Sequence, residues 1–374
     1  MTYRFHVLGI PHTATNDDWL CCAYTQKVLK LCRMLRDRGH HVIHYGNEAS
    51  RVPCEHVTVT DGRDIGSPSD YLKFDINDRT HRLFATGAIA AIERRKRPKD
   101  FLLCMWGAGH KAVADAHAEL TVVEPGIGYA GGHFAFFKVF ESYAMLHAYK
   151  GLNAVGHGNS MSAYEAVIPN YFDPDDFEYS AHRGGYLLFL GRIDEGKGTH
   201  IAVEVAKRCN LPLVIAGPGQ MRLPDYDKVE IVGVVDRTKR RELLANANAL
   251  LAPSTFLEPF CGVVTEAHFS GTPTITHDWG AQAENNVHGL TGFRCRTLEQ
   301  FVWAVKNIDR IEARDCRRWA DNFTIERVAA MYDEYWDMVA AVIGGAGWYQ
   351  ENPERAQLDW LTKNVQWSVH MRDR

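Results

Sequence analysis

The sequence has 374 residues, of which 46% are hydrophobic and 24% charged, a composition that can fill two substantial hydrophobic cores. The formal net charge of -4 gives no broad positive footprint for nucleic acid, and no segment approaches the roughly 18 apolar residues of a membrane-spanning helix. Nine cysteines occur without a CxxC motif, the histidines have no metal-ligand spacing, and the first residues form a strand pattern rather than a signal peptide. We therefore expect a soluble cytoplasmic protein with reduced thiols and no metal site.

The first half of the chain alternates short apolar strands with helical segments. The strands and apolar segments are Arg4–Ile10, His41–Tyr45, Val57–Thr60, Phe101–Trp106, Leu120–Val123 and, last, Asn153–Val155 before Val167. Helical periodicity covers Trp19–Arg38, which ends at Gly39, and about Thr80–Arg95.

The second half begins again after a polar, turn-forming stretch from Asp173 to Gly185. Its predicted strands are Tyr186–Leu190, Leu213–Ala216, Val229–Val232, Ala249–Ala252, Thr274–Thr276 and Gly292–Arg294. The predicted helices between them include Thr199–Cys209, Arg237–Ala247 and Gly262–Ser270, and a further helix runs from Thr324 to about Val342.

Continuous apolar strands that alternate with helices indicate parallel sheets covered on both faces. We therefore predict an α/β protein with two Rossmann-like, doubly wound domains facing a cleft, and with C-terminal helices. The predicted domains are residues 1–172 and residues 173–342. From the expected fold, residues 343–374 form a tail that packs back on the first domain.

Two glycine-rich turns follow strands of the second half. In the first, Gly191 precedes Arg192 and Lys197, so a flexible backbone and two cations lie near the start of a helix. Fixed cations and helix amides stabilise the charge that grows on a departing diphosphate without a metal ion. The second turn, with Gly217 and Gly219, lies where open α/β sheets bind ligands. Either turn alone is also compatible with an ordinary solvated loop.

Two glutamates lie eight positions apart across the start of a predicted helix. Glu258 lies in the loop after Ser254, and Glu266 lies in the first turns of the helix that begins near Gly262. A poorly solvated carboxylate needs hydrogen-bond donors, and the hydroxyls of ribose and hexose are suitable ones. By itself, Glu266 could equally be a first-turn helix glutamate.

The order of these motifs resembles the group 1 retaining glycosyltransferases of the GT-B fold. The matching motifs are Gly191-Arg192…Lys197-Gly198, Ala216–Gly219, Ala252–Ser254, Glu258-x7-Glu266, Gly271–Pro273 and Asp278–Gly280…Glu284, within about Val167–Arg327. The resemblance implies that Arg192 and Lys197 hold the diphosphate, that Glu258 contacts the transferred sugar and that Glu266 holds the ribose. It also implies that the backbone amides of Phe260, Cys261 and Gly262 complete the donor pocket. On this resemblance, residues 1–172 form the acceptor side and residues 173–342 form the nucleotide-sugar donor side.

The chain departs from the family pattern at several positions. Cys261 stands where the family usually has glycine, and the first-domain loops lack the usual Gly-Gly pair and histidine. Residues that could face the acceptor or the sugar are His12, His110, Glu124, Gly126, Tyr129 and His133. The run Gly126–Gly131 also fits G-x-G-x-x-G, but an aromatic run follows it, with no clear strand and no acidic partner, which disfavours an NAD site.

The resemblance implies a retaining hexosyl- or pentosyltransferase that needs no cofactor other than its nucleoside-diphosphate sugar. The acceptor is expected to be a hydroxyl of a glycan or of another small or polymeric molecule. Two alternatives stay open: transfer to a modified DNA base, which the net charge disfavours, and a nucleotide-sugar epimerase or binding protein.

Overall fold

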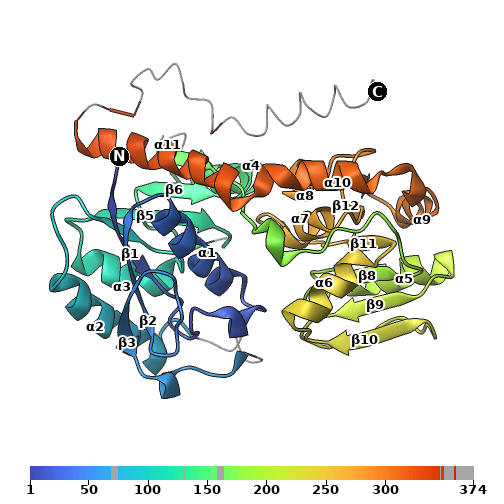
Figure 1. Cartoon of the computed structure of the whole chain (residues 1–374), viewed down its shortest axis with the longest axis horizontal. Helices are drawn as coiled ribbons and strands as arrows, with labels where there is room; N and C mark the ends of the chain where they lie inside the picture. The colour runs from blue at the N-terminus through green and yellow to red at the C-terminus, as the bar shows by residue number, and fades with distance from the viewer. Residues whose placement is uncertain (69–74, 130, 158–163, 346, 349–357, 359–374) are drawn as a thin grey trace. The chain divides into compact units, whose positions relative to one another are not determined.

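The computed structural model describes residues 1–68, 75–129, 131–157, 164–345, 347–348 and 358. These residues divide into two compact α/β units (Figure 1). Unit 1 comprises residues 1–141, residues 149–168 and the described residues from Val328 onward. Unit 2 comprises residues 142–148 and 169–327. Both units are built around a parallel sheet, as the sequence predicts.

The sheet of unit 1 has the strand order β3-β2-β1-β4-β5-β6-β7. Its strands are β1 Arg4–Leu8, β2 His41–Asn47, β3 Glu55–Thr60, β4 Phe101–Leu103, β5 Thr121–Ile127, β6 Phe137–Phe140 and β7 Glu165–Val167. The helices that contribute to this unit are α1 Ala23–Asp37, α2 Arg79–Glu93, α3 Ala108–Ala116, α4 Tyr143–His157 and α11 Ile325–Ile343. All strand pairs are parallel, and Val7 of β1 lies opposite both His44 and Leu103. Apolar residues of α2 and α3, such as Phe84 and Val113, pack in one core cluster with Leu8 and Ile43.

The sheet of unit 2 has the strand order β10-β9-β8-β11-β12-β13. Its strands are β8 Leu187–Leu190, β9 Leu213–Ala216, β10 Val229–Gly233, β11 Ala249–Ala252, β12 Thr274–His277 and β13 Gly292–Cys295. Its helices are α5 Thr199–Cys209, α6 Arg237–Ala245, α7 Gly262–Phe269, α8 Gln282–Asn285, α9 Leu298–Lys306 and α10 Ala313–Ala320. Short 3₁₀ turns in the two units cover Asp17–Trp19, Gly62–Asp64, Pro174–Asp176, Ile308–Arg310 and Asp321–Phe323.

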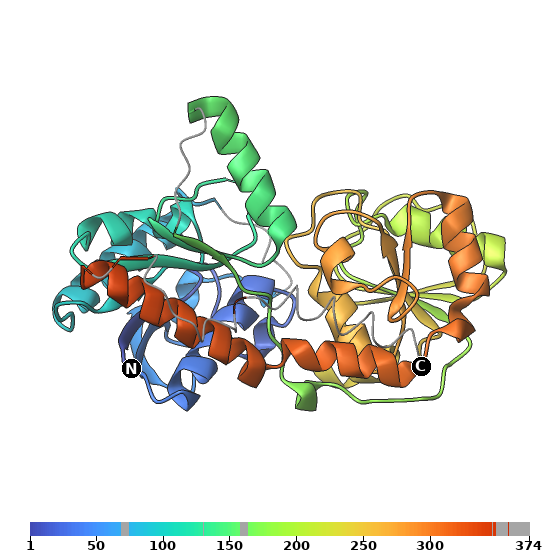
Figure 2. The ribbon, with the colours of Figure 1, turned by 90° about the horizontal axis from the view of Figure 1, so that it is seen from above.

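The sequence of β8 is apolar without a break because both faces of the strand are covered. Because successive side chains of a strand point to opposite faces, Leu187 and Phe189 pack with α5 and α9, whereas Leu188 and Leu190 pack with α6 and α7. Figure 2 shows helices on both sides of this sheet. A strand that is covered on both faces reads as a continuous apolar run.

The order of the strands places a switch point in each sheet. From β8 the chain moves to β9 and β10 on one side, and it then returns to place β11 on the other side of β8. The loops that follow β8 and β11 therefore leave the sheet in opposite directions, which opens a crevice at the carboxyl ends of these strands. In unit 1, β1 and β4 have the same relation.

The structure corrects two predictions in the first half. Asn153–Val155 is not a separate strand segment, because it lies inside helix α4. The aromatic run after Gly131 does contain the next strand, β6 at Phe137–Phe140, which pairs with β5 and β7. Aromatic residues favour strands, but β6 has only four residues, which is too few to show a period of two.

The C-terminal helix α11 also differs from the predicted domain limits. Residues from Val328 onward, which were expected to end the second domain, belong to unit 1. The reason is aromatic packing: the Trp336 ring lies 5.1 Å from the ring of Phe5 and 5.7 Å from that of Phe101. Most of the predicted tail lies outside the described residues. Trp348 is buried, with its ring 5.4 Å from that of Tyr164 in unit 1.

Within the described residues, none of the helices combines the length and the apolar character that crossing a bilayer requires.

Candidate active site

The loops after β8 and β9 run side by side beyond the ends of their strands. The Gly191 amide donates to the Ala216 carbonyl at 2.9 Å, and the Ile193 amide donates to the Pro218 carbonyl at 2.8 Å. Gly217 has a φ of +142°, and a Cβ atom there would lie 1.9 Å from the Gly191 carbonyl oxygen. Only glycine fits such an approach. The turn predicted from Gly217 and Gly219 is thus packed tightly against the loop that carries Arg192.

A second close approach joins the loop after β8 to the loop after β11. Gly198 has a φ of +71°, and a Cβ atom there would lie 2.1 Å from the Pro253 carbonyl oxygen. The Thr255 amide donates to the Gly196 carbonyl at 2.8 Å. These are the two loops that diverge at the switch point of unit 2, and their contact fixes the side chains that they carry.

Lys197 and Glu258 form an ion pair at this junction. Lys197 Nζ donates to Glu258 Oε1 at 2.7 Å, and Ser254 Oγ donates to the same oxygen at 2.5 Å. The Glu258 side chain is 6% exposed and that of Lys197 is 22% exposed. Both bonds end on Oε1, so among the described residues Glu258 Oε2 has no hydrogen-bond donor. The pair thus offers a cation and a carboxylate oxygen to a ligand. It is held in place by the two bonds to Glu258 Oε1 and by the Lys197 backbone amide, which donates to Asp194 Oδ1 at 2.7 Å.

Arg192 lies on the same loop and is held more loosely. Its side chain is 39% exposed, and its Nε is 3.6 Å from Asp194 Oδ2. A long ion pair between two exposed side chains contributes little to stability. The guanidinium is therefore available to an anionic ligand with little loss of internal bonding.

Cys261 precedes α7 in a left-handed conformation, with φ +62° and ψ +59°. This conformation costs a residue with a Cβ atom about 1–2 kcal/mol, a strain that glycine would not have. The thiol is buried, and Gln282 Nε2 lies 3.5 Å from its sulfur. Burial raises the pKa of the Cys261 thiol, so the side chain is a packing group and not a nucleophile.

Glu266 on α7 has its own cationic partner. Arg240 on α6 donates from Nε to Glu266 Oε2 at 3.0 Å, and its Nη2 contacts the same oxygen. Because Arg240 uses only Oε2, Oε1 has no hydrogen-bond donor among the described residues. The two predicted glutamates are therefore each paired with a different cation. Sequence analysis did not identify Arg240, since it stands in a run of basic residues on an ordinary surface helix.

In unit 1, Glu124 and its neighbours form a hydrogen-bonded network that fixes a loop. Glu124 is fully buried; its Oε1 accepts from the Tyr129 hydroxyl at 2.7 Å, and its Oε2 accepts from the Phe134 and Ala135 amides, each at 2.9 Å. His133 Nε2 bonds to the Tyr129 carbonyl at 2.9 Å, and the two rings stack. Burial raises the pKa of Tyr129 and lowers that of His133, so both are neutral near pH 7.

His110 has no ring nitrogen left for a ligand. Its Nδ1 accepts from the Met105 amide at 3.1 Å, and its Nε2 donates to the Gly9 carbonyl at 2.9 Å. Burial lowers the pKa of His110 to about 3, so the ring stays neutral and links the ends of β1 and β4. His12 lies in the loop after β1, with its ring 5.2 Å from that of Trp106. Of the predicted acceptor-side residues, His12 therefore lies at the switch point of the unit 1 sheet.

The run that begins at Gly126 does not open a helix. Gly126 has a φ of +79° inside β5, its carbonyl accepts from Lys27 Nζ at 3.0 Å, and the chain continues through a loop to β6. The described part of the run therefore lacks the helix N-terminus that a dinucleotide fingerprint requires.

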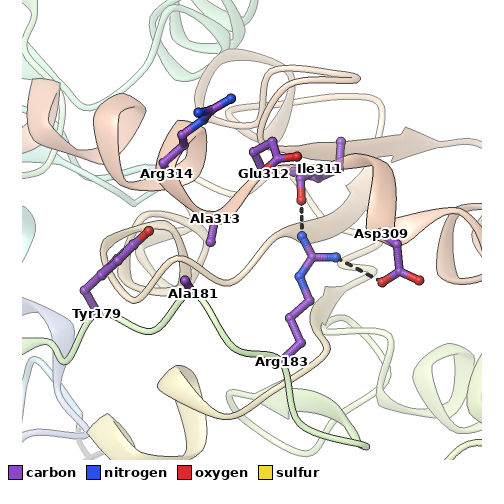
Figure 3. A pocket seen from close by; sticks show the side chains of 8 residues that line it. All are labelled: Tyr179, Ala181, Arg183, Asp309, Ile311, Glu312, Ala313 and Arg314. Atoms are coloured by element: carbon purple, nitrogen blue, oxygen red, sulfur yellow. Dashed lines mark hydrogen bonds and ion pairs between the residues drawn. The ribbon is translucent and has the colours of Figure 1, made fainter.

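A hollow of about 300 Å³ lies elsewhere in unit 2 (Figure 3). Its wall includes Arg183, which donates to the Ile308 carbonyl at 2.8 Å and also bonds to the Ile311 carbonyl. Arg183 precedes β8, so this hollow is at the amino ends of the strands, opposite to the loops described above. Since the guanidinium is bonded to backbone carbonyls, we do not assign the donor site to this hollow.

Within the described residues there is no group of three or more His, Cys, Asp or Glu side chains that could hold a metal ion.

The chain is similar to known proteins in sequence and in fold. Residues 175–322 match the family described as glycosyl transferases group 1. Glycogen synthase of Mycobacterium tuberculosis is 33% identical over 162 residues, which are 38% of this chain and 39% of that enzyme. The chain thus matches about two fifths of the length of this curated relative.

Two solved structures show the same fold over nearly the whole chain. Sucrose-phosphate synthase from Thermosynechococcus elongatus has a TM-score of 0.69 and 15% identity, with 91% of this chain and 100% of that chain covered. Anabaena HepE, solved in complex with UDP and glucose, has a TM-score of 0.66 and 14% identity, with 90% and 99% covered. Residues 175–322 therefore match the group 1 glycosyltransferase family, within a chain that has the two-domain α/β architecture of GT-B glycosyltransferases.

Proposed function

We propose that this protein transfers a sugar from a nucleoside-diphosphate sugar to an acceptor hydroxyl, with retention at the anomeric carbon and without a metal ion. The observation that carries the proposal is the Lys197–Glu258 pair at the contact between the two loops that diverge at the unit 2 switch point. Open α/β sheets bind ligands at this position. The proposal is also supported by the family of residues 175–322 and by the complex of HepE with UDP and glucose.

In this proposal the diphosphate is held by Lys197, Arg192 and the first amides of α7. The first N–H groups of a helix have no partner within the helix, and its N-terminus favours an anion. As the bond to the anomeric carbon breaks, charge grows on the leaving phosphate oxygen. Lys197 can stabilise that charge without leaving Glu258, because an ammonium group has three donors.

Glu258 and Glu266 are proposed to bind two different sugars of the donor. Glu258 Oε2 would accept from a hydroxyl of the transferred sugar, and Glu266 Oε1 would accept from a ribose hydroxyl. In each case a cation holds the other carboxylate oxygen, which fixes the orientation of the free one. Arg240 is thus a positioning residue for the ribose contact.

Retention is proposed to arise without a nucleophile from the protein. The acceptor oxygen attacks from the face that the diphosphate leaves, forms the new bond to the anomeric carbon, and gives its proton to the leaving phosphate oxygen. The buried thiol of Cys261 is unsuited to a covalent step, because burial holds its pKa above the ordinary value.

The direct test is to incubate the protein with UDP-, GDP-, ADP- and dTDP-sugars, with saccharide acceptors, and with or without EDTA. Release of the nucleoside diphosphate that requires an acceptor and survives EDTA is the expected result, with the product anomer determined by NMR. Lys197→Ala should lose most of the turnover, whereas Lys207→Ala, an exposed lysine in the last turn of α5, should retain it.

Three outcomes would count against the proposal. Interconversion of donor sugars without an acceptor would favour an epimerase, and binding without any turnover would favour a nucleotide-sugar-binding protein. An inverted product would refute retention.

A further inference from the structure

The loop after β12 presents an exposed tryptophan. Trp279 is 39% exposed, although tryptophan side chains are mostly buried in folded proteins. Its neighbour Asp278 anchors the loop: the Asp278 carboxylate accepts from Arg296 at 2.8 Å and lies 3.3 Å from Arg294 Nε, and its amide donates to the Cys295 carbonyl at 3.1 Å. The indole is therefore carried by a short loop that is tied to β13.

Stacking on one of its faces holds the Trp279 ring in one orientation. It stacks on His277, with ring centroids 4.0 Å apart and an angle of 17° between the planes. His277 is buried; its Nδ1 bonds to the Ser254 carbonyl at 2.8 Å, and its ring meets Phe301 edge-on at 5.1 Å. Burial lowers the pKa of His277, so the supporting ring is neutral. One face of the indole is thus covered, and its exposed area comes from the edge and the opposite face.

Trp279 is connected to the candidate active site through two contacts. Ser254, whose carbonyl binds His277, also donates its hydroxyl to Glu258 Oε1. Gly280 lies against the Glu258 loop, since a Cβ atom there would be 3.1 Å from Leu257 Cδ1 and 3.7 Å from the Glu258 amide nitrogen. Leu257 is itself 40% exposed. An exposed apolar rim of Trp279 and Leu257 therefore lies beside the carboxylate assigned to the transferred sugar.

We propose that the exposed face of Trp279 stacks on a sugar ring of the acceptor, so that the acceptor is a saccharide or glycoside. A pyranose presents C–H groups on one face, and the negative face of an aromatic ring attracts such weakly positive hydrogens. Tryptophan offers the largest such face, and a fixed ring loses little conformational entropy on binding. This inference rests on the proposed function, because it assigns the second substrate of the same site.

The experiment compares Trp279→Ala and Trp279→Phe with the wild type in the transfer assay. The acceptors are the methyl glycosides and the disaccharides of glucose, galactose and mannose, with glycerol and a serine peptide as acceptors that lack a sugar ring. The matched control is Trp303→Ala, since Trp303 is 47% exposed on α9, outside the loops of the site.

We expect Trp279→Ala to raise the KM for the saccharide acceptor about tenfold, equivalent to about 1.4 kcal/mol. The effect on the donor KM should be at least five times smaller, at about twofold or less, because the donor sugar is held by hydrogen bonds to Glu258. Trp279→Phe retains a smaller aromatic face and should recover part of the affinity. It also serves as the second variant if alanine disturbs the loop. Trp303→Ala should leave both KM values as in the wild type.

Three results would overturn the inference. An equal rise of the donor and acceptor KM in Trp279→Ala would assign the tryptophan to the donor. An acceptor KM unchanged in both variants would remove Trp279 from the site. Turnover with glycerol or the peptide, but with none of the saccharides, would refute a saccharide acceptor while the glycosyltransferase proposal stands. Failure of the wild type to consume any nucleotide sugar would instead refute the proposed function itself.

Discussion

Replacing Lys197 by methionine should separate the stability of the Lys197–Glu258 pair from its chemistry. The substitution keeps a long apolar stem but leaves the Glu258 carboxylate, 6% exposed, with Ser254 as its remaining donor. Breaking a buried ion pair by removing one partner costs about 3–5 kcal/mol. Because Lys197 is 22% exposed, water can replace part of the lost interaction, and we expect a destabilisation of about 2 kcal/mol. In a domain the size of unit 2 this lowers the melting temperature by about 4–8 °C.

The same variant should lose about 10²–10³-fold in kcat, the effect of removing one preorganised donor from a developing oxyanion. A second substitution distinguishes the two effects. Glu258→Gln in the Lys197→Met background removes the stranded charge, so the melting temperature should recover while activity stays low. Lys207→Met is the control for loss of a lysine in the same region.

Thermal melts followed by circular dichroism, together with nucleoside-diphosphate release, provide the two measurements. A double variant that is less stable than Lys197→Met alone would refute the argument from an uncompensated buried charge. A Lys197→Met enzyme with wild-type kcat would remove the lysine from the leaving-group site.

Three further predictions concern the backbone and the buried histidines. Gly217→Ala should abolish donor binding and destabilise unit 2 by more than 2 kcal/mol in urea unfolding, because the new Cβ atom clashes with the Gly191 loop. The control is Gly233→Ala, which has φ +69° and no atom within 4 Å of the new Cβ, and which should cost only about 1 kcal/mol. Cys261→Gly should be more stable than Cys261→Ala by about 1 kcal/mol, the reverse of the usual order, because only glycine relieves the left-handed strain; equal stabilities would refute that strain. Burial lowers the pKa of His44 and His110 to about 3, from 6.5 when unfolded, so the unfolded state binds more protons in acid. The free energy of unfolding should be highest well above pH 6.5 and should fall as the pH drops from about 7.5 to 3, by about 1.4 kcal/mol for each histidine at pH 5.5. A flat urea profile over that range would contradict this prediction.

The sequence by itself determined the two parallel sheets and the glycine-rich loops that carry the candidate donor site. The strands of unit 2 are covered on both faces, so Leu213–Ala216 and Ala249–Ala252 appear as unbroken apolar runs whose limits match the structure. Gly198 and Gly217 have positive φ and stand where the loops approach each other. Both lie in turns that the sequence predicts from their glycines. Such local features can be predicted from sequence because each reflects the conformation or the burial of its own residue.

Only the tertiary structure decided which side chains meet. The pairing of Glu266 with Arg240 and the stacking of Trp279 on His277 depend on how α6 packs beside α7 and on how β12 ends. The helix that carries Trp336 leaves the second domain and packs on Phe5, some 330 positions away in the sequence. Such contacts depend on long-range packing, and neither periodicity nor turn chemistry encodes the partner of a given side chain.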